Sequence, residues 1–546
     1  MGRFRNFVTN LARLADTPAP PRPAGGTPTS VQRRASAPYD AGATGRRAQT
    51  WQTTMLGQNT LLWSNLDQLR ARARDAVRNN PWAASAIDRF EANVIGTGIQ
   101  PHWQHADPKI REQIHAAWNR WQQDADWCGQ LDFYGLQALM AREIFEAGEV
   151  FVRYRLRPPK DRAYIPLQLQ LLEGEQLPVW RNIPRLTNGH AVRSGIEFNG
   201  QQQRVAYHFY REHPGESMYY QAAYEIVEIP AEEIRHVYRF TRAGQLRGEP
   251  RMTAVLALLY ELEQYTDAAL VKKKVAAMFA GFITKPVPEA QILPPDPGPQ
   301  PNTGTPPPIF PDPGTANAKM EAGTMQELLP GESISFPDLP SESDFEAFMR
   351  TELHKFAAGV GLTYEQITTD LRGVNYSSIR AGLLEFRRAC EQFQYMVLVQ
   401  QGCQPIMKRW MDEAVLAGRL SLPGYFRDPY AYQDVTWVPP GWEWVDPLKE
   451  AQAAQMDVRN GFTSRSMVVR SRGLDPNEVD QQSAQERQRA GELGVIYDSD
   501  PNQTFLHSEA VPDTQTVPKP EVEEDEEGAV PPGEMPAARR PRERVQ

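Results

Sequence analysis

The most regular hydrophobic pattern in the chain lies between residues 341 and 418 and begins with a predicted helix. Ser341 or Ser343 is the expected N-cap, and acidic residues occupy the opening turn. The pattern stops at a pair of glycines, Gly359 and Gly361, where the helix is expected to end. The apolar residues at helical spacing are Phe345, Phe348, Leu353 and Phe356.

A second, longer helix is predicted from about Ser377. Its apolar residues recur every three or four positions and form one continuous stripe, which is typical of an amphipathic helix. The stripe consists of Ile379, Leu383, Phe386, Cys390, Phe393 and Val397. Pro405 is expected to kink or interrupt this helix, and Gly418 is the expected C-cap. The part before Pro405 would be roughly 40 Å long.

The segment Tyr364–Tyr376 connects the two helices and is polar. It carries Asp370, Arg372, Gly373 and Asn375. Two helices joined in this way form a hairpin with an exposed tip. On spacing alone, an ordinary helical hairpin within a core is the simpler interpretation.

The N-terminal part of the chain turns helical at Asn65, after residues 1–50, whose composition predicts a disordered arm. A helix over Asp67–Arg78 is followed by a break at Pro81 and a helix from Trp82 to about Val94. Arginines two residues apart point to different sides of a helix, so this cluster does not predict a DNA-reading face. The arginines are Arg70, Arg72, Arg74 and Arg78.

Residues 108–240 mix helices and strands. Helices are predicted at Pro108–Asp124, with Trp118 and Trp121 in a core, and at Phe133–Glu146. Segments rich in β-branched and aromatic residues predict strands. These are Val150–Leu156, Leu167–Leu172, Arg204–Arg211, Tyr224–Ile229 and Ile234–Phe240. The mixture predicts an α+β outer domain; His208, His213 and His236 lack a recognised metal-ligand spacing.

A further long helix is predicted over Glu249–Ile283, opened by Pro250 near its first turn and roughly 50 Å long. It is rich in alanine and has few partners nearby in sequence. Copies of the same chain arranged in a ring would supply those partners. Lys285–Ala318 is rich in proline and reads as an exposed linker, and Met320–Pro337 as strand, turn and strand.

The C-terminal third predicts three short capped helices. Asp446, then Thr463 or Ser464, then Asp475 are the expected N-caps, and Pro447 and Pro476 suit the first helical position. From residue 498 the composition predicts a disordered tail, with an acidic block at Glu521–Glu527 followed by arginines at 539–544. A solvated tail is the simpler interpretation, and a partner-binding tail remains open.

Composition limits the function classes. The 546 residues suggest about two to four packed units, and the 47 prolines exceed the usual share of about 5%. The net charge of −9 argues against a surface that grips nucleic acid everywhere. Three cysteines form no disulfide framework, and no apolar run is long enough to span a membrane. We identify no secretion signal, nucleotide-binding P-loop, hydrolase motif or cofactor motif.

Three long blocks resemble the lambda-type portal proteins of tailed bacteriophages and prophages, in the same order along the chain. The first is RARDAVRNNPWAASAIDRFEANVIGTGIQP at Arg72–Pro101, and the second is GVGLTYEQITTDLRGVNYSSIRAGLLEFRR at 359–388. The third is DPLKEAQAAQMDVRNGFTSRSMVVRSRGLDPNEV at Asp446–Val479. Matches of this length, spread over most of the chain, are more specific than any short motif.

The resemblance implies a mostly helical α+β subunit with wing, stem, clip and crown, assembled as a dodecameric ring. It divides the chain as follows: arm 1–50; wing 51–248; first stem helix 249–283; clip with its proline-rich insertion 284–340; second stem helix 341–362; tunnel loop 363–376; long tunnel helix 377–420; wing return and helical crown 421–497; tail 498–546. The proline-rich insertion departs from the compact clip that the family leads us to expect.

The resemblance further implies a portal protein, the DNA channel at one capsid vertex, which acts in packaging and ejection. Its implied partners are terminase, capsid, scaffolding and head-completion proteins and non-specifically bound double-stranded DNA, with no membrane. Virion location follows, after assembly in the host cytoplasm. The residues expected to face DNA are Asp370, Arg372, Gly373, Asn375, Tyr376 and Arg380. The alternatives are another head–tail connector ring or a metal-dependent DNA-processing enzyme; packing alone would also explain Tyr376.

Overall fold

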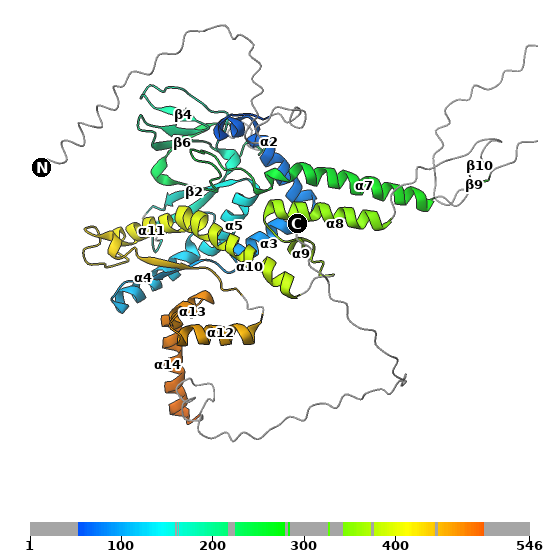
Figure 1. Cartoon of the computed structure of the whole chain (residues 1–546). Helices are drawn as coiled ribbons and strands as arrows, with labels where there is room; N and C mark the ends of the chain where they lie inside the picture. The colour runs from blue at the N-terminus through cyan, green and yellow to red at the C-terminus, as the bar shows by residue number, and fades with distance from the viewer. Residues whose placement is uncertain are drawn as a thin grey trace, which may run out of the picture. The chain divides into compact units, whose positions relative to one another are not determined.

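The computed structural model describes residues 53–158, 161, 163–216, 224–278, 282–283, 326–327, 342–372, 376–442 and 446–495 (Figure 1). The chain divides into two compact units. The first comprises residues 1–94 and 123–417, and the second comprises residues 95–122 and 418–546. The arm at 1–50, the insertion at 285–318 and the tail at 498–546 lie outside the described residues.

The first unit opens with two helices, α2 (Gln58–Asn79) and α3 (Pro81–Val94). The helix expected from Asn65 therefore starts two turns earlier, because Leu62 and Leu66 are both buried against Val179. Asn80 separates the helices, and its side-chain oxygen accepts the backbone N–H groups of the next helix's first turn. The predicted break before α3 is confirmed.

Two antiparallel sheets follow helix α5 (Phe133–Glu146). The three-stranded sheet has the order β3-β2-β8, with β2 at Glu149–Leu156, β3 at Leu167–Glu173 and β8 at Ile234–Tyr238. The four-stranded sheet has the order β4-β5-β6-β7, at Ala191–Arg193, Ile196–Phe198, Arg204–Tyr210 and Ile226–Pro230. The five predicted strands are confirmed, whereas β4 and β5 were missed because three residues show no periodicity.

Apolar side chains of both sheets meet in one core. Tyr207 and Phe209 of β6 point to the same side of the strand, and they pack with Phe151 of β2. The other members of this cluster are Leu172, Leu177, Ile196, Phe198, Ile229 and Ile234.

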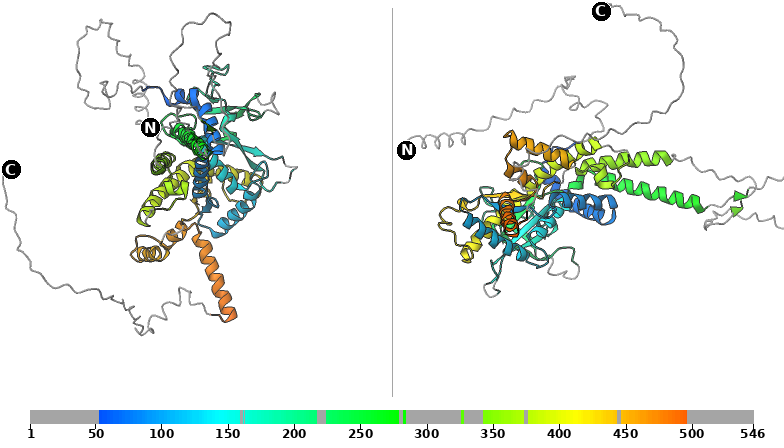
Figure 2. Two further views of the ribbon diagram at one scale, coloured as in Figure 1. Left: turned by 90° about the vertical axis from the view of Figure 1, so that its right-hand side faces the viewer. Right: turned by 90° about the horizontal axis from the view of Figure 1, so that it is seen from below.

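Two long helices leave this unit side by side, as Figures 1 and 2 show: α7 (Leu256–Met278) and α8 (Glu342–Val360). Tyr265 of α7 stacks on Phe345 of α8 at a centroid distance of 5.6 Å and contacts the edge of Phe348 at 5.0 Å. The helix expected from Glu249 begins only at Leu256. Residues 251–254 form a 3₁₀ turn instead, because the preceding segment is held against β2, where a Cβ on Gly248 would lie 2.0 Å from the Gly148 carbonyl oxygen.

The short helix α9 (Tyr364–Thr368) lies between α8 and α10 (Tyr376–Phe393). Helix α10 continues as a π-helical segment, η8 (Gln394–Cys403), and then as α11 (Gln404–Leu416). Pro405 was expected to kink or interrupt the helix, but it lies in the first turn of α11. The wider winding of η8 accommodates the residue that has no N–H to donate. The C-cap of α11 is Ala417, and the predicted Gly418 follows it with φ +67°, the left-handed geometry typical of the position after a C-cap.

The second unit contains a two-stranded antiparallel sheet, β1 (Gln100–Trp103) with β11 (Val435–Val438), and helix α4 (Pro108–Trp121). The predicted core positions of Trp118 and Trp121 are confirmed. Three further helices are α12 (Pro447–Arg459), α13 (Arg465–Ser471) and α14 (Pro476–Leu493). Their N-caps are the predicted Asp446, Ser464 and Asp475.

Short elements complete the described part of the chain. Single 3₁₀ turns occur at η2 (Gln122–Asp124), η4 (Gly174–Gln176), η6 (Ala231–Glu233) and η9 (Pro429–Ala431). The strand pair predicted within Met320–Pro337 is described only at β10 (Gln326–Glu327), which pairs in parallel with β9 (Phe282–Ile283). Across the described residues, every helix is too short or too polar to cross a bilayer.

Candidate functional site

The expected DNA-facing segment starts with a helix that is capped at both ends. Thr363 and Gln366 form a reciprocal capping box at the start of α9, with N···O distances of 3.3 and 2.9 Å. At its other end Thr369 adopts left-handed backbone geometry, with φ +55°. The chain therefore turns sharply at Thr369, and the next residues leave the helix axis.

Asp370 and Arg372 form a local pair directly after this turn. The Arg372 Nε and Nη2 atoms donate to the two Asp370 carboxylate oxygens at 2.9 and 3.1 Å, and the Arg372 backbone N–H donates to Oδ1 at 3.1 Å. These hydrogen bonds hold the pKa of Asp370 below its usual value, and the carboxylate raises the pKa of Arg372. Both groups are therefore charged at neutral pH.

The pair is connected to helix α8. Arg372 contacts the Glu346 carboxylate at 3.2 Å, yet its own side chain remains 75% exposed. The Tyr364 hydroxyl donates to Asp370 at 3.3 Å, and the Tyr364 ring stacks on His354 of α8 at a centroid distance of 4.4 Å. Glu346 and Tyr364 were missed as site residues because the contacts span different elements, which spacing does not reveal.

The other predicted site residues are only partly described. Gly373 and Asn375 lie outside the described residues. Tyr376 is the first residue of α10, but its side chain is outside the described part, and Arg380 lies one turn later and is half-buried. The structure thus brings Asp370 and Arg372 together and places Arg380 in the second turn of α10.

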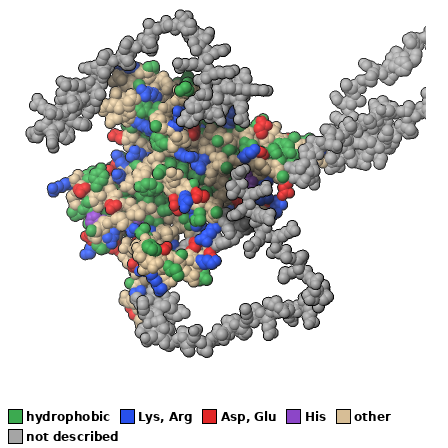
Figure 3. All heavy atoms as spheres, in the orientation of Figure 1, with side chains coloured by type: hydrophobic (Ala, Val, Ile, Leu, Met, Phe, Trp, Pro, Cys, Tyr) green, Lys and Arg blue, Asp and Glu red, His purple; other side chains and the backbone are tan. Residues whose placement is uncertain are grey.

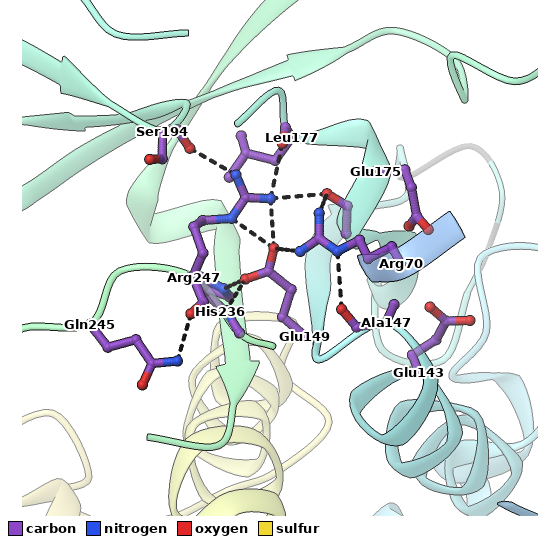
Figure 4. Close-up of polar contacts among 12 residues, drawn as sticks. Arg70, Glu143, Ala147, Glu149, Glu175, Leu177, Ser194, His236, Gln245 and Arg247 are labelled. Carbon is purple, nitrogen blue, oxygen red and sulfur yellow. Dashed lines mark hydrogen bonds and ion pairs between the residues drawn. The ribbon is translucent and has the colours of Figure 1, made fainter. Parts of the chain in front are cut away.

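A second polar cluster is deeply buried and is centred on Glu149 at the start of β2 (Figure 4). Its Oε1 atom accepts from Arg70 of α2 and, at 2.7 Å, from Arg247 Nε. Its Oε2 atom accepts from His236 Nε2 at 2.8 Å and from the backbone N–H of Gly248 at 2.6 Å. The opposing charges of Arg247 and Arg70 overcome the desolvation of the carboxylate and hold the Glu149 pKa well below its usual value.

The two arginines of this cluster also bind the backbone. Arg247 donates to the carbonyl oxygens of Ser194, Gly174 and Leu177, at 2.9 to 3.0 Å, and Arg70 donates to those of Ala147 and Gly174, each at 3.0 Å. The pKa of His236 is lowered to about 3 by burial, which keeps the ring neutral. The two arginines and Glu149 thus connect the backbone segments that supply these carbonyl groups to Arg247, which precedes α7. The role is structural.

A related cluster surrounds Arg74, one helical turn after Arg70. Its guanidinium contacts Glu143 and Glu175 at 2.9 and 2.7 Å and Glu146 at 3.5 Å. These carboxylates raise the pKa of Arg74, whereas burial raises the pKa of Glu143 to about 7. One guanidinium cannot neutralise every carboxylate, so we expect the more deeply buried Glu143 to take up a proton first.

Two groups of carboxylates and histidines have donor atoms close enough to hold a metal: Glu173, Glu175 and His213, and Glu197, His208 and Glu228. In the second group His208 Nδ1 accepts from Arg181, so Nε2 carries the proton that it donates to Glu197. His213 Nδ1 likewise accepts from the Gly215 N–H. Both Nε2 atoms are thus protonated donors, and the groups serve as hydrogen-bond networks.

Comparison with known proteins identifies the class. The family model described as phage portal protein, lambda family, matches residues 44–394. The chain therefore belongs to the lambda family of phage portal proteins. The matched region contains both sheets, α7, α8 and the Asp370–Arg372 pair.

Individual relatives agree with this assignment. The chain is 28% identical over 451 residues to a probable portal protein of Halomonas phage phiHAP-1, covering 80% of this chain and 83% of that one. It is 24% identical over 493 residues to portal protein B of Escherichia phage lambda, covering 85% and 91%. Among solved structures it is similar to a chain from the virion of a native gene transfer agent particle, with 16% identity, a TM-score of 0.37, and 75% and 94% coverage. The chain's function is that of a portal protein, a head–tail connector and virion component.

Proposed function

We propose that twelve copies of this chain form a ring whose central channel passes DNA, with the loop at residues 363–376 facing that DNA. The observation that carries the proposal is the Asp370–Arg372 pair, an exposed and charged side-chain pair held on a capped turn. The capped helix α9 holds the turn that carries the pair. The 75% exposure of the Arg372 side chain leaves its guanidinium accessible to a phosphate.

The charges around Arg372 suit a passing contact. Two carboxylates, Asp370 and Glu346, lie within 3.2 Å of one guanidinium, so this group has no net positive charge. A phosphate would have to exchange with Asp370 or Glu346, which weakens its attraction. Such contacts position a duplex without reading its bases. On the face shown in Figure 3, basic and acidic side chains are likewise interspersed.

Family membership supports a proposal for the remaining roles. Residues 284–340, between α7 and α8, would form the clip that docks terminase, and α12–α14 would form the crown. The ring would nucleate procapsid assembly with capsid and scaffolding proteins in the host cytoplasm and later carry the head-completion proteins. We propose no catalytic role and no cofactor. Metal-dependent DNA cleavage by the purified chain, with magnesium or manganese, would contradict this.

The ring is tested on the purified full-length chain by negative-stain electron microscopy together with mass measurement. Wide rings with a central hole and a mass of twelve subunits are expected. A monomer at every concentration would contradict the proposal, and rings of another subunit number would contradict only the dodecamer.

The loop is tested with the double variant Arg372→Ala and Asn375→Ala. Rings should form normally, while DNA packaging or retention in particles should fall, because the DNA loses the two side-chain contacts that we propose. Arg388→Ala is the matched control: Arg388 is 74% exposed and pairs with Glu385 at 2.7 Å, but it lies along α10 and away from the turn. Loss of rings in the double variant, or an equal defect in the control, would refute the assigned role.

A further inference from the structure

Arginines occur at alternate positions along strand β2 and just beyond it: Arg153, Arg155 and Arg157. Alternate residues of a strand point to the same face of the sheet. On this face Phe151 precedes the arginines and is buried in the core between the two sheets. We call the three arginines the arginine ladder. It starts where the apolar core between the sheets ends.

Two residues of the ladder, Arg153 and Arg155, line a cavity of about 340 Å³ at the edge of that core. Arg153 and Arg155 form one wall with Gln170 of β3, which pairs with Arg153 in the strand register. Residues of β6 and β7, among them Tyr210, line the opposite wall. The cavity is therefore bounded by both sheets and lies entirely within the first unit.

Polar atoms in this cavity lack partners. The Nε atoms of Arg153 and Arg155 and the Oε1 atom of Gln170 are buried and accept or donate no hydrogen bond among the described residues. Buried polar groups are nearly always satisfied, so unsatisfied atoms on three residues that line one cavity point to a polar ligand there. Two of the three are arginine donors, which favours a ligand with anionic oxygens.

Few carboxylates lie close enough to the ladder to neutralise its positive charges. Among the described residues Arg155 has no carboxylate within ion-pair distance and is stacked over the Trp127 ring at 4.8 Å, while Arg153 reaches Glu233 only at 3.5 Å. Arg157 donates to the uncharged Gln168. Burial lowers the pKa of Arg155, and the neighbouring charge of Arg153 lowers it further. Arg211 at the rim already pairs with Glu225 at 2.6 Å, and Glu212 limits the excess charge.

The sequence contains a segment with the complementary pattern. Residues 521–527 read EVEEDEE, and every alternate position, Glu521, Glu523, Asp525 and Glu527, is acidic. In an extended chain these carboxylates fall on one side at a spacing of about 6.8 Å, the same spacing as side chains along one face of a strand. If extended, the acidic segment would therefore match the spacing of the ladder.

We propose that the acidic segment 521–527 of this chain docks on the arginine ladder, with its alternate carboxylates on Arg153, Arg155 and Arg157. Roughly 25 residues separate it from the last described residue, Val495, and so long a connection spans up to about 80 Å when extended. Covalent attachment raises the local concentration of the segment, so modest intrinsic affinity suffices. The ladder's recessed position favours a slender peptide over a DNA duplex, whose phosphates lie on a broad, rigid surface.

The test measures binding of a fluorescein-labelled peptide of residues 517–530 by anisotropy. The receptor is the full-length chain carrying Glu523→Gln and Asp525→Asn, so that its own tail does not compete. We expect saturable binding that weakens with salt. Arg155→Gln should weaken it about 10-fold or more, since charge-assisted hydrogen bonds are lost. Arg155→Lys keeps the charge but loses the planar guanidinium. Its affinity for the peptide should lie between that of the receptor and that of Arg155→Gln.

Matched controls separate register from charge. Arg193→Gln removes an arginine that lies over Phe198 on the neighbouring sheet and should leave binding unchanged. A peptide with Glu524→Gln and Glu526→Gln should bind more tightly than one with Glu523→Gln and Asp525→Asn, although both lose two charges. Equal effects within either pair, or no saturable binding by a normally folded receptor, would overturn the proposal. So would a short DNA duplex that binds more tightly and displaces the peptide.

Discussion

The Glu149 cluster and the Asp370–Arg372 pair use the same chemistry in opposite surroundings. In each, guanidinium N–H groups meet a carboxylate at hydrogen-bond distance. Arg70, Arg247 and Glu149 are almost completely buried, whereas the Arg372 side chain is 75% exposed. Within water-excluded surroundings a charge cannot lose its partner without a large cost, but at the surface water replaces the partner readily.

This difference separates a structural cluster from a contact site. Glu149 fixes the segments around β2 in one arrangement because nothing else could satisfy its neighbours. Arg372 can exchange Asp370 for another anion at little cost, which is what a transient contact with a phosphate backbone requires. Burial therefore decides which of the two clusters is available for function.

Removal of the buried carboxylate should have the largest effect. Glu149→Gln leaves Arg70 and Arg247 without their counter-ion, and the free energy of unfolding should fall by about 3–5 kcal/mol. Urea unfolding of the isolated chain, followed by tryptophan fluorescence, measures the change. Glu225→Gln breaks the exposed pair with Arg211 and should cost less than about 1 kcal/mol. Similar losses in both variants would remove the distinction between buried and exposed pairs.

A smaller effect of the same kind is expected from pH. The folded-state pKa of Glu143, about 7, lies above the unfolded value of 4.5, so the folded chain binds more protons between these values. Its contribution to stability is complete below about pH 4.5 and disappears as the pH rises through about 7. Glu143→Gln should flatten the dependence by on the order of 3 kcal/mol over this window.

Glu175 bonds the same Arg74 guanidinium and supplies the control. Its pKa is lowered because the hydrogen bond from Arg74 and the charges of Arg70 and Arg74 outweigh its desolvation. Its contribution is therefore present above the unfolded value of 4.5 and is lost on acidification. Glu175→Gln should lower stability at pH 8 and change little near pH 3. If both variants shifted stability in the same direction, the assignment of the proton to Glu143 would be wrong.

The smallest effect on stability is expected at the exposed pair. Asp370→Asn should leave the unfolding midpoint unchanged within error, because water can hydrogen-bond to Arg372 and to residue 370 in place of the lost ion pair. It should nevertheless strengthen DNA retention at low salt, since Arg372 loses a competing carboxylate. Particle DNA content after a salt series measures the effect. An unfolding midpoint that falls as far as that of Glu149→Gln would make the pair structural.

The sequence determined the local elements and the class of the protein. Caps at Asp446, Ser464 and Asp475 and the stripe on α10 depend on neighbours a few residues away, so their pattern is readable from the chain itself. The long blocks that resemble lambda-type portals are also properties of the sequence. Asp370 and Arg372 were both predicted as site residues, but their hydrogen-bonded pairing was found only in the structure.

Only the tertiary structure showed which charged side chains are buried and which are exposed. Arg70, Glu149 and Arg247 are separated by 79 and 98 positions and meet only through packing. The late start of α7 and the π winding before Pro405 likewise depend on distant contacts and on continued packing of α10 and α11. Hydrophobic periodicity records which face of an element is buried, but it carries no information about which distant polar group will meet it there. Tertiary packing determines which polar groups meet. It also determines how much an ion pair contributes to stability, because that contribution depends on the pair's exposure to water.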